Sequence, residues 1–424
     1  MRLGLLAIVA AAVVVASGSA VERAAPASTT ASDDVRYLMS EIERIHPDPF
    51  HATPKPQFEA AADVLAARAD SLTPNQLLVE LMRFTTLLGE RDGHSGIFPL
   101  DSAHKRVLHL FPLYLYKFSD GLFVVSAPGR RALVGSKLLA IDGIPADELE
   151  QAVRPLVPRD NEATRTDRFM SFMLTAEVLQ GLGLRLGSGP ARFTLQKPGA
   201  AAQDVTLAPV TASAYLRLMT PEFPSFVYAL PKRPQPLYLR RRGDDHYVTT
   251  IDRGRAIFVG YNLTLGSTGP DARKLARLLK SRKVRRVVVD VRLNPGGDNH
   301  TYVPLLKVLR SKAVNRPGRL FVLISRSTFS AAANFITELD RKTKAVFVGE
   351  TSGGAPNLYG DVAAVDLPTA GVTVNVAAVY WQLGAASDPR NAIEPDVPVA
   401  LGSGAFLRGK DPVLAAALRY RVGR

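Results

Sequence analysis

The chain has 424 residues, of which 46% are hydrophobic and 22% charged, a composition typical of a soluble globular protein with two or three domains. It contains no cysteine, which excludes disulfides, thiolate metal sites, a cysteine nucleophile and a lipidated N-terminal cysteine. The formal net charge of +14 includes basic clusters at 240–242 and 280–286, without interleaved aromatic residues. We interpret them as a solvated basic face and expect no nucleic-acid partner; a functional anionic partner is the alternative.

The N-terminal segment, residues 1–20, has an early arginine, an apolar run and a small-residue end, the pattern of a secretory signal peptide. We expect cleavage after Ala20; the alternative is an uncleaved anchor that keeps the protein close to a membrane. Both interpretations place the body outside the cytoplasm, either secreted, periplasmic or associated with the cell envelope. Residues 21–34 are small and polar, which predicts a flexible lead-in.

Apolar residues then recur at helical spacing, and residues 35–100 are predicted to form a helical region. This region ends in "DGHSG" (92–96), where two glycines bracket His94. Between 101 and 210 the pattern changes to short strands with one helical insertion. Residues 211–250 are rich in proline and polar residues, which is typical of a connector.

From 251 to 424 strands alternate with helices, which favours a largely parallel sheet with crossover helices. In such sheets the chemistry lies at the carboxyl ends of strands. "NPGG" (294–297) follows one strand and Ser330 follows the next. Consecutive glycines and a helix start can both offer free amide hydrogens to a developing oxyanion. Taken singly, however, "NPGG" is typical of a turn and Ser330 of a helix cap.

Several short motifs, in this order along the chain, resemble those of the tail-specific (C-terminal processing) peptidase family, especially its tricorn-core and interphotoreceptor retinoid-binding protein-like branch. They are "HPDPF" (46–50), "DGHSG" (92–96), "DVRLNPGG" (290–297), "TFSAAANF" (328–335), "GETSGGAPN" (349–357) and "IEPDVPV" (393–399). The resemblance spans nearly all of the chain after the leader. It implies an α/β, ClpP/crotonase-like fold with a mostly parallel sheet and crossover helices, and a catalytic core at 251–424.

Residues 123–153 also resemble a PDZ-type module as found inside processing proteases. The stretch has a glycine before a strand that ends in "IDG", followed by a short helix. We therefore expect a PDZ-like β subdomain at 101–210, which would bind extended peptide ends by strand addition. A β subdomain without that role is the alternative.

The family resemblance implies that Ser330 is the nucleophile and that the backbone amides of Gly296, Gly297 and Ala331 form the oxyanion hole. One branch of the family uses a lysine as the base, but "GETSGGAPN" contains none. His94 matches the histidine of the tricorn-like branch and is our choice of general base; an ordinary turn histidine is the alternative. His46 and His300 are weaker candidates.

A histidine base works best when a polar group orients its second nitrogen. The resemblance places an acid shortly before the last Pro-Asp motif, and we choose Asp388, although Glu394 is closer to that motif. Asp92 or Ser95 are further sources of this contact. The seven histidines show no close metal-ligand spacing, so we expect no metal and no cofactor.

The leading hypothesis is a secreted serine peptidase of the tail-specific family, which forms an acyl-enzyme on Ser330 with His94 as general base. Its partner would be a peptide or protein substrate, presented as a chain end or an unfolded segment. A non-catalytic peptide- or lipid-binding relative with the same fold is one alternative. A small-ester serine hydrolase is another, although the Gly-x-Ser-x-Gly elbow of α/β-hydrolases is absent.

Overall fold

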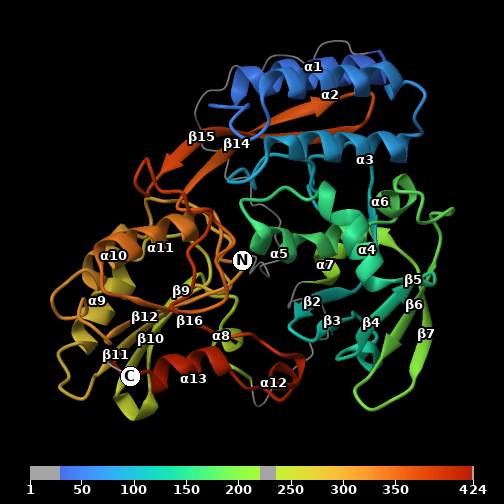
Figure 1. Cartoon of the computed structure of the whole chain (residues 1–424). Helices are drawn as coiled ribbons and strands as arrows, with labels where there is room; N and C mark the ends of the chain where they lie inside the picture. Colours follow the sequence, from blue (N-terminus) through green and yellow to red (C-terminus); the bar gives the residue numbers. More distant parts are fainter. Residues whose placement is uncertain (1–28, 220–234, 423–424) are drawn as a thin grey trace.

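The structure is a computed structural model that describes residues 29–219 and 235–422 (Figure 1). The expected signal peptide and most of the expected lead-in lie outside these residues. The end of the lead-in is helical, because α1 (Ala31–Ile45) starts at Ala31 with Thr30 as its cap. Within the described ranges, no helix has the length and apolar character needed to cross a membrane.

The N-terminal region consists of three helices, α1, α2 (Lys55–Ala69) and α3 (Pro74–Thr85), and the short 3-10 helix η1 (Thr86–Leu88). A capping box sets the start of α3, because Thr73 and Gln76 each bind the backbone amide of the other. Gly89, with φ of 87°, ends the helical segment, and the chain then runs into the loop that carries His94.

A hairpin from the far end of the chain completes the core of this helical region (Figure 1). It consists of β14 (Asn357–Leu367) and β15 (Val372–Gln382), paired antiparallel. Val365 and Val374 of the hairpin lie in one buried cluster with Leu38 of α1. The hairpin therefore packs with the N-terminal helices, although it lies within the stretch 251–424 that we expected to form the catalytic core.

The β subdomain is an antiparallel sheet in the order β2-β3-β4-β6-β7, with the short β5 paired to β4. Asp142 and Gly143 form the tight β4–β5 turn, both with positive φ. Three helices lie between β5 and β6, and β1 pairs with β8 beside the sheet. The bounds are β1 (His109–Leu110), β2 (Tyr114–Phe118), β3 (Gly121–Ser126), η2 (Arg131–Leu133), β4 (Lys137–Ile141), β5 (Ile144–Pro145), α4 (Ala146–Val153), η3 (Arg154–Leu156), α5 (Glu162–Met173), α6 (Ala176–Gly181), β6 (Ala191–Gln196), β7 (Ala202–Leu207) and β8 (Val210–Thr211).

The third part is a six-stranded sheet in the order β16-β13-β12-β11-β10-β9, parallel except for the edge strand β9. Helices α9, α10 and α11 cover one face and α13 covers the other, as Figure 1 shows. This confirms the expected α/β fold with crossover helices. The bounds are β9 (His246–Ile251), η4 (Asp252–Gly254), β10 (Ala256–Tyr261), α9 (Gly269–Leu278), β11 (Arg286–Asp290), α10 (Val303–Leu309), β12 (Leu320–Ile324), α11 (Ala331–Lys342), β13 (Val346–Gly349), β16 (Val397–Pro398), α12 (Ser403–Leu407) and α13 (Pro412–Arg419).

The expected connector at 211–250 contains more regular structure than its proline content predicts. It holds α7 (Ala212–Leu218), α8 (Leu237–Arg240) and most of β9. The β-branched run "HYVTTI" (246–251) joins the sheet as an edge strand, because it can pair with β10 along its whole length.

The "DVR" part of the glycine motif fixes the end of β11. The guanidinium of Arg292 is nearly buried and donates to the carboxylates of Asp290 and Asp411. Asp411 also caps α13. Because β11 and β12 are parallel neighbours, this anchored strand end brings "NPGG" and Ser330 to the same edge of the sheet.

Candidate active site

Ser330 lies in a strained turn between β12 and α11. It occupies the N-cap position of α11, but its side chain makes no capping hydrogen bond. Its φ of 53° and ψ of −128° fall outside the favoured regions for a residue with a side chain. The preceding loop is held to the end of β11, since Phe329 N–H donates to Asn294 O at 3.1 Å and Ser325 Oγ to Arg292 O at 2.7 Å. The strained backbone thus leaves the Ser330 hydroxyl free to turn away from the helix.

His94 reaches this hydroxyl from the other end of the chain. Its Nε2 lies 3.0 Å from Ser330 Oγ, and its ring stacks on Phe329 with 4.5 Å between centroids. The hairpin holds the loop that carries His94: Tyr359 N–H donates to Arg91 O at 2.8 Å, and Gly96 pairs with a strand residue of β15. The structure therefore brings together the predicted nucleophile and the predicted base.

The ring of His94 is neutral at neutral pH. Desolvation and, to a smaller extent, the Arg168 guanidinium lower the pKa of His94 to about 4, although Asp92 and the backbone of Tyr359 act in the opposite direction. A neutral Nε2 can accept the proton of Ser330 if Nδ1 carries the ring hydrogen. That Nδ1 is buried and has no hydrogen-bond partner among the described side chains, so the Tyr359 backbone is the contact that favours the protonated ring. The pair is thus a Ser–His dyad without an orienting acid.

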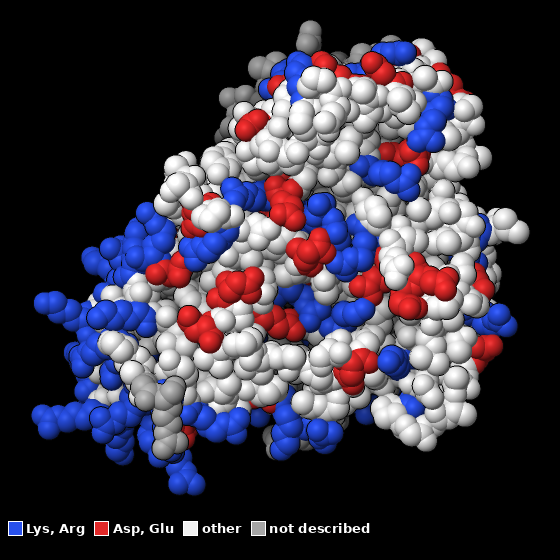
Figure 2. All heavy atoms as spheres, in the orientation of Figure 1, with Lys and Arg blue, Asp and Glu red and all other residues white. Residues whose placement is uncertain are grey.

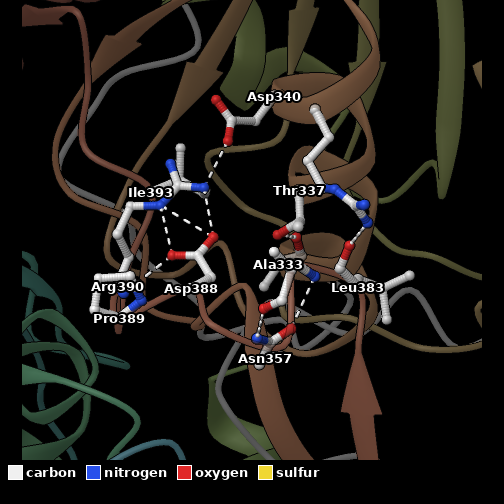
Figure 3. A network of polar contacts seen from close by, with 12 residues as sticks. Ala333, Thr337, Asp340, Asn357, Leu383, Asp388, Pro389, Arg390 and Ile393 are labelled. Carbon is white, nitrogen blue, oxygen red and sulfur yellow. Dashed lines mark hydrogen bonds and ion pairs between the residues drawn. The ribbon is translucent and has the colours of Figure 1, made fainter.

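Asp388 does not supply the orienting acid. Its carboxylate receives the Arg390 guanidinium, with Nε 3.0 Å from Oδ1 and Nη2 2.8 Å from Oδ2, and Arg390 also binds Asp340 (Figure 3). This hydrogen bonding to Arg390 lowers the pKa of Asp388 and keeps it ionised. The prediction that Asp388 orients His94 is therefore corrected: an arginine two residues away captures its side chain.

The other candidates for this contact are also engaged elsewhere. Glu394 accepts from Thr351 Oγ1 at 2.5 Å. Ser95 Oγ accepts the amide of Ala377 at 2.8 Å. Asp92 Oδ1 accepts the amide of Ser95 at 3.1 Å, which folds the loop tightly around the histidine. None of these three side chains hydrogen-bonds to His94.

The two weaker histidine candidates lie away from Ser330. His46 is buried, and its Nε2 is 3.2 Å from Asp92 Oδ2, outside hydrogen-bond geometry. His46 thus packs against Asp92, in the loop that carries His94. His300 is exposed and pairs with Asp298 at 2.9 Å. Among the residues that the structure describes, no cluster of three histidine or acidic side chains is arranged to hold a metal ion.

Two of the three predicted oxyanion donors have free amides. The Gly296 amide donates to Asn294 Oδ1 at 3.0 Å and is therefore occupied. No hydrogen bond within the described chain uses the amides of Gly297 or Ala331. Gly296 has a different role, because a Cβ there would lie 2.5 Å from Ser330 Cβ, and its φ is 116°. The glycine allows the strand end to approach Ser330.

A buried carboxylate that the motifs did not indicate holds the loop of His94 in place. Asp160 Oδ1 accepts the Gly93 amide at 2.7 Å, and its Oδ2 accepts the Ala355 amide at 3.0 Å. Burial raises the pKa of Asp160 to about 7, against the effect of the two amides and of Arg168. Asp160 thus ties the loop of His94 to the turn at 352–356. Its only sequence signal is its place before Asn161, the cap of α5.

Arg168, on α5, completes this support. Its buried guanidinium donates to the carbonyl of Gly93, and it lies 4.3 Å from the ring of Phe329. Gly93 is therefore held through its amide by Asp160 and through its carbonyl by Arg168. Phe329 in turn stacks on His94, so one buried arginine contacts both the loop that carries His94 and the ring that packs on it.

A cleft of about 820 Å³ lies between the edge strand β2, α5 and the segments 349–351 and 391–400. Lys117, Asn161 and Arg326 are on its wall, whereas Ser330 and His94 are not. Arg326 connects the six-stranded α/β part with the β subdomain, because it pairs with Glu350 and donates to the carbonyl of Lys117 at 2.9 Å. The cleft is thus bounded by the loop that leads to the nucleophile.

Comparison with solved structures places this arrangement in a fold class. No protein-family model and no curated protein sequence matches the chain. Its fold is that of the tail-specific proteases, which confirms the fold that the motifs implied. Mature CPAF in complex with lactacystin is 14% identical, with a TM-score of 0.60 over 90% of this chain and 95% of that one. Another structure of mature CPAF is 15% identical, with a TM-score of 0.58 over 90% and 94%. The photosystem II D1 C-terminal processing protease also matches, at 14% identity and a TM-score of 0.44 over 91% and 99%.

Proposed function

We propose that this protein is a serine peptidase of the tail-specific type. The observation that carries the proposal is the 3.0 Å contact between Ser330 Oγ and His94 Nε2. The Ser330 side chain is available for this contact because it makes no capping hydrogen bond to α11. A nucleophilic serine needs a neutral base within hydrogen-bond reach, and burial keeps His94 neutral. The similar fold of known proteases supports the same reaction class.

The reaction follows from the positions of these groups. Ser330 Oγ attacks the peptide carbonyl while its proton passes to His94 Nε2. The oxyanion then receives the amides of Gly297 and Ala331, which lack other partners. The His94 imidazolium protonates the departing amine, and a water molecule repeats the sequence to release the acyl group. Asp160 and Arg168 act as positioning residues, because they contact the loop and not the reacting atoms.

We further propose that the β subdomain is PDZ-like and binds the end of the substrate chain, and that the protein acts outside the cytoplasm. The turn at Asp142 and Gly143 and the helix α4 directly after β5 support the first point. The leader pattern at 1–20 supports the second. N-terminal sequencing of protein from the culture medium or envelope should begin after Ala20; protein recovered only from the cytoplasm would contradict this.

A fluorophosphonate probe tests the nucleophile directly. The full chain should be labelled, whereas Ser330→Ala should not react and His94→Ala should react at least about 100-fold more slowly, as expected for loss of a general base. Ser40→Ala, which removes an exposed serine of α1, is the matched control and should react like the parent. Labelling of Ser330→Ala at the parent rate would refute the assignment. A folded parent that neither reacts nor cleaves peptides would favour a non-catalytic binding protein.

A further inference from the structure

The net charge of this protein is concentrated in one stretch of the chain. Residues 253–344 contain 20 Lys and Arg against 5 Asp and Glu, an excess of 15, whereas the whole chain has an excess of 14. The remainder is therefore close to neutral. Sixteen of these basic residues are exposed, and no acidic residue of the stretch is. We call the exposed set the basic pole; it comprises Arg253, Arg255, Arg273, Lys274, Arg277, Lys280, Arg282, Lys283, Arg285, Lys307, Arg310, Lys312, Arg316, Arg341, Lys342 and Lys344.

The topology of the sheet gathers this charge away from the active site. Most of the basic pole lies in the segments that precede β10, β11, β12 and β13, and thus at the amino ends of parallel strands. The rest lies on α9, on α10 and in the last turn of α11. Ser330 lies at the carboxyl edge of the same sheet. Figure 2 shows Lys and Arg crowded over the side of α9 and α10, whereas both signs mix on the central face.

The charges of the basic pole are mostly uncompensated. Within the part of the chain that the structure describes, only Arg255 and Lys342 of the sixteen form an ion pair, with Asp252 and Glu338. Like charges at this density repel one another, which disfavours the folded state at low ionic strength. An external anionic partner would relieve that repulsion.

The shape and composition of the basic pole favour a broad surface as this partner. Its side chains line none of four cavities found among the described residues. Every aromatic residue of 253–344 is buried, which leaves no platform for stacked nucleobases. Clustered Lys and Arg without such a platform suit the headgroups of anionic lipids.

We propose that the basic pole docks the protein onto a membrane surface rich in anionic phospholipids. The carboxyl edge of the sheet, with Ser330, then points away from the lipid and stays open to chains in the surrounding solution. The attraction acts within about 10 Å at 0.1 M salt, so docking is reversible and sensitive to ionic strength. This proposal does not depend on peptidase activity.

Vesicle sedimentation of the full chain tests the docking. The protein should bind vesicles of phosphatidylcholine with phosphatidylglycerol much more strongly than phosphatidylcholine alone, and high salt should release it. Any apolar contribution of residues 1–20 is common to both vesicle types. The double variant Arg282→Glu/Lys283→Glu should lose more than about tenfold in affinity, because each reversal removes one attraction and adds one repulsion.

The matched control is Arg130→Glu/Arg131→Glu, which reverses two exposed arginines of the β subdomain and should bind like the parent. Fluorophosphonate labelling at the parent rate would show that both double variants are folded. If the parent does not react with the probe, circular dichroism spectra of the two variants are compared with that of the parent instead. Equal loss in the two doubles would overturn the proposal, as would equal binding to both vesicle types. Duplex DNA that binds the parent and displaces it from anionic vesicles would also overturn it.

Discussion

Replacement of Asp160 by asparagine should separate the support of the base from the chemistry. Asparagine keeps one oxygen acceptor but puts an NH2 group against the amide of either Gly93 or Ala355. One charge-assisted hydrogen bond is lost and one buried amide is left without a partner, a change of about 1.5–3 kcal/mol. If that energy holds the loop in place, kcat should fall about 10- to 100-fold. KM should change little, because Asp160 does not line the cleft.

The pH profile gives a signature that a loss of stability would not. Above a pH of about 7 the Asp160 carboxylate is ionised and accepts both amides; below it the protonated acid keeps one acceptor fewer. Activity of the parent should therefore fall in two steps, first through the pKa of Asp160 at about 7 and then through that of His94 at about 4. In Asp160→Asn only the lower step should remain. Arg168 and Asp92 are the charged groups that act on Asp160, and both are unchanged in this variant.

The rate of fluorophosphonate labelling from pH 3 to 9 is the assay. Asp167→Asn is the control, because its half-buried carboxylate binds Ser327 and not the loop of His94. That variant should keep the step near the pKa of Asp160, at about 7. The reasoning fails if Asp160→Asn labels at the parent rate with an unchanged profile, or if the upper step persists in it.

Thermal unfolding of the parent should show the opposite pH trend to its activity. The pKa of Asp160 is raised in the folded state, from 3.8 to about 7. The protonated form is thus favoured by folding, and stability is lost as pH rises from about 4 through 7, by up to about 4 kcal/mol. In Asp160→Asn this loss should disappear. The assignment would be contradicted if the melting temperatures of the parent and of Asp160→Asn changed in the same way between pH 4 and 8.

Three further changes give distinct results. Asp388→Asn should leave kcat/KM within about twofold of the parent, since its carboxylate does not contact His94; a loss above tenfold would restore it as the acid. Gly296→Ala should abolish labelling, because the new Cβ would lie 2.5 Å from Ser330 Cβ; parent-like labelling would show that the strand end is free to move. Arg292→Met should lower the free energy of unfolding by about 3–5 kcal/mol, because it leaves the buried carboxylate of Asp290 and the nearly buried one of Asp411 without their cation. A urea titration measures this, and a change below about 1 kcal/mol would refute the role of these ion pairs.

The parts of the site that could be predicted from sequence are those fixed by local pattern and sheet topology. Adjacent parallel strands necessarily bring "NPGG" and Ser330 to one edge, and the motif resemblance located His94. Side-chain partners were harder to predict. Asp388 has a suitable position in the sequence, but Arg390, two residues later, binds it. Asp160 acts through backbone amides, whose positions no local sequence pattern reveals.

Long-range packing accounts for the main difference in domain organisation. The alternating pattern of 357–382 predicts strands equally well in the catalytic core or elsewhere. Its apolar face is buried against α1–α3, which helical periodicity alone leaves without a partner. Local composition does not reveal which apolar faces pack together, because tertiary geometry decides this. Segment boundaries drawn from composition therefore did not assign the hairpin to the N-terminal helical region.

The hairpin of β14 and β15 makes the assembly of Ser330 with His94 depend on a late part of the chain. His94 and Ser330 are 236 residues apart, and the loop of His94 is bound by Tyr359 and Asn375, which are synthesised after the nucleophile. A nascent or partly unfolded chain therefore carries a serine with no base beside it. Contacts of such sequence separation form late, because loop closure must precede them. If Ser330 is a nucleophile, its activation therefore waits until the N-terminal region and the hairpin have packed together.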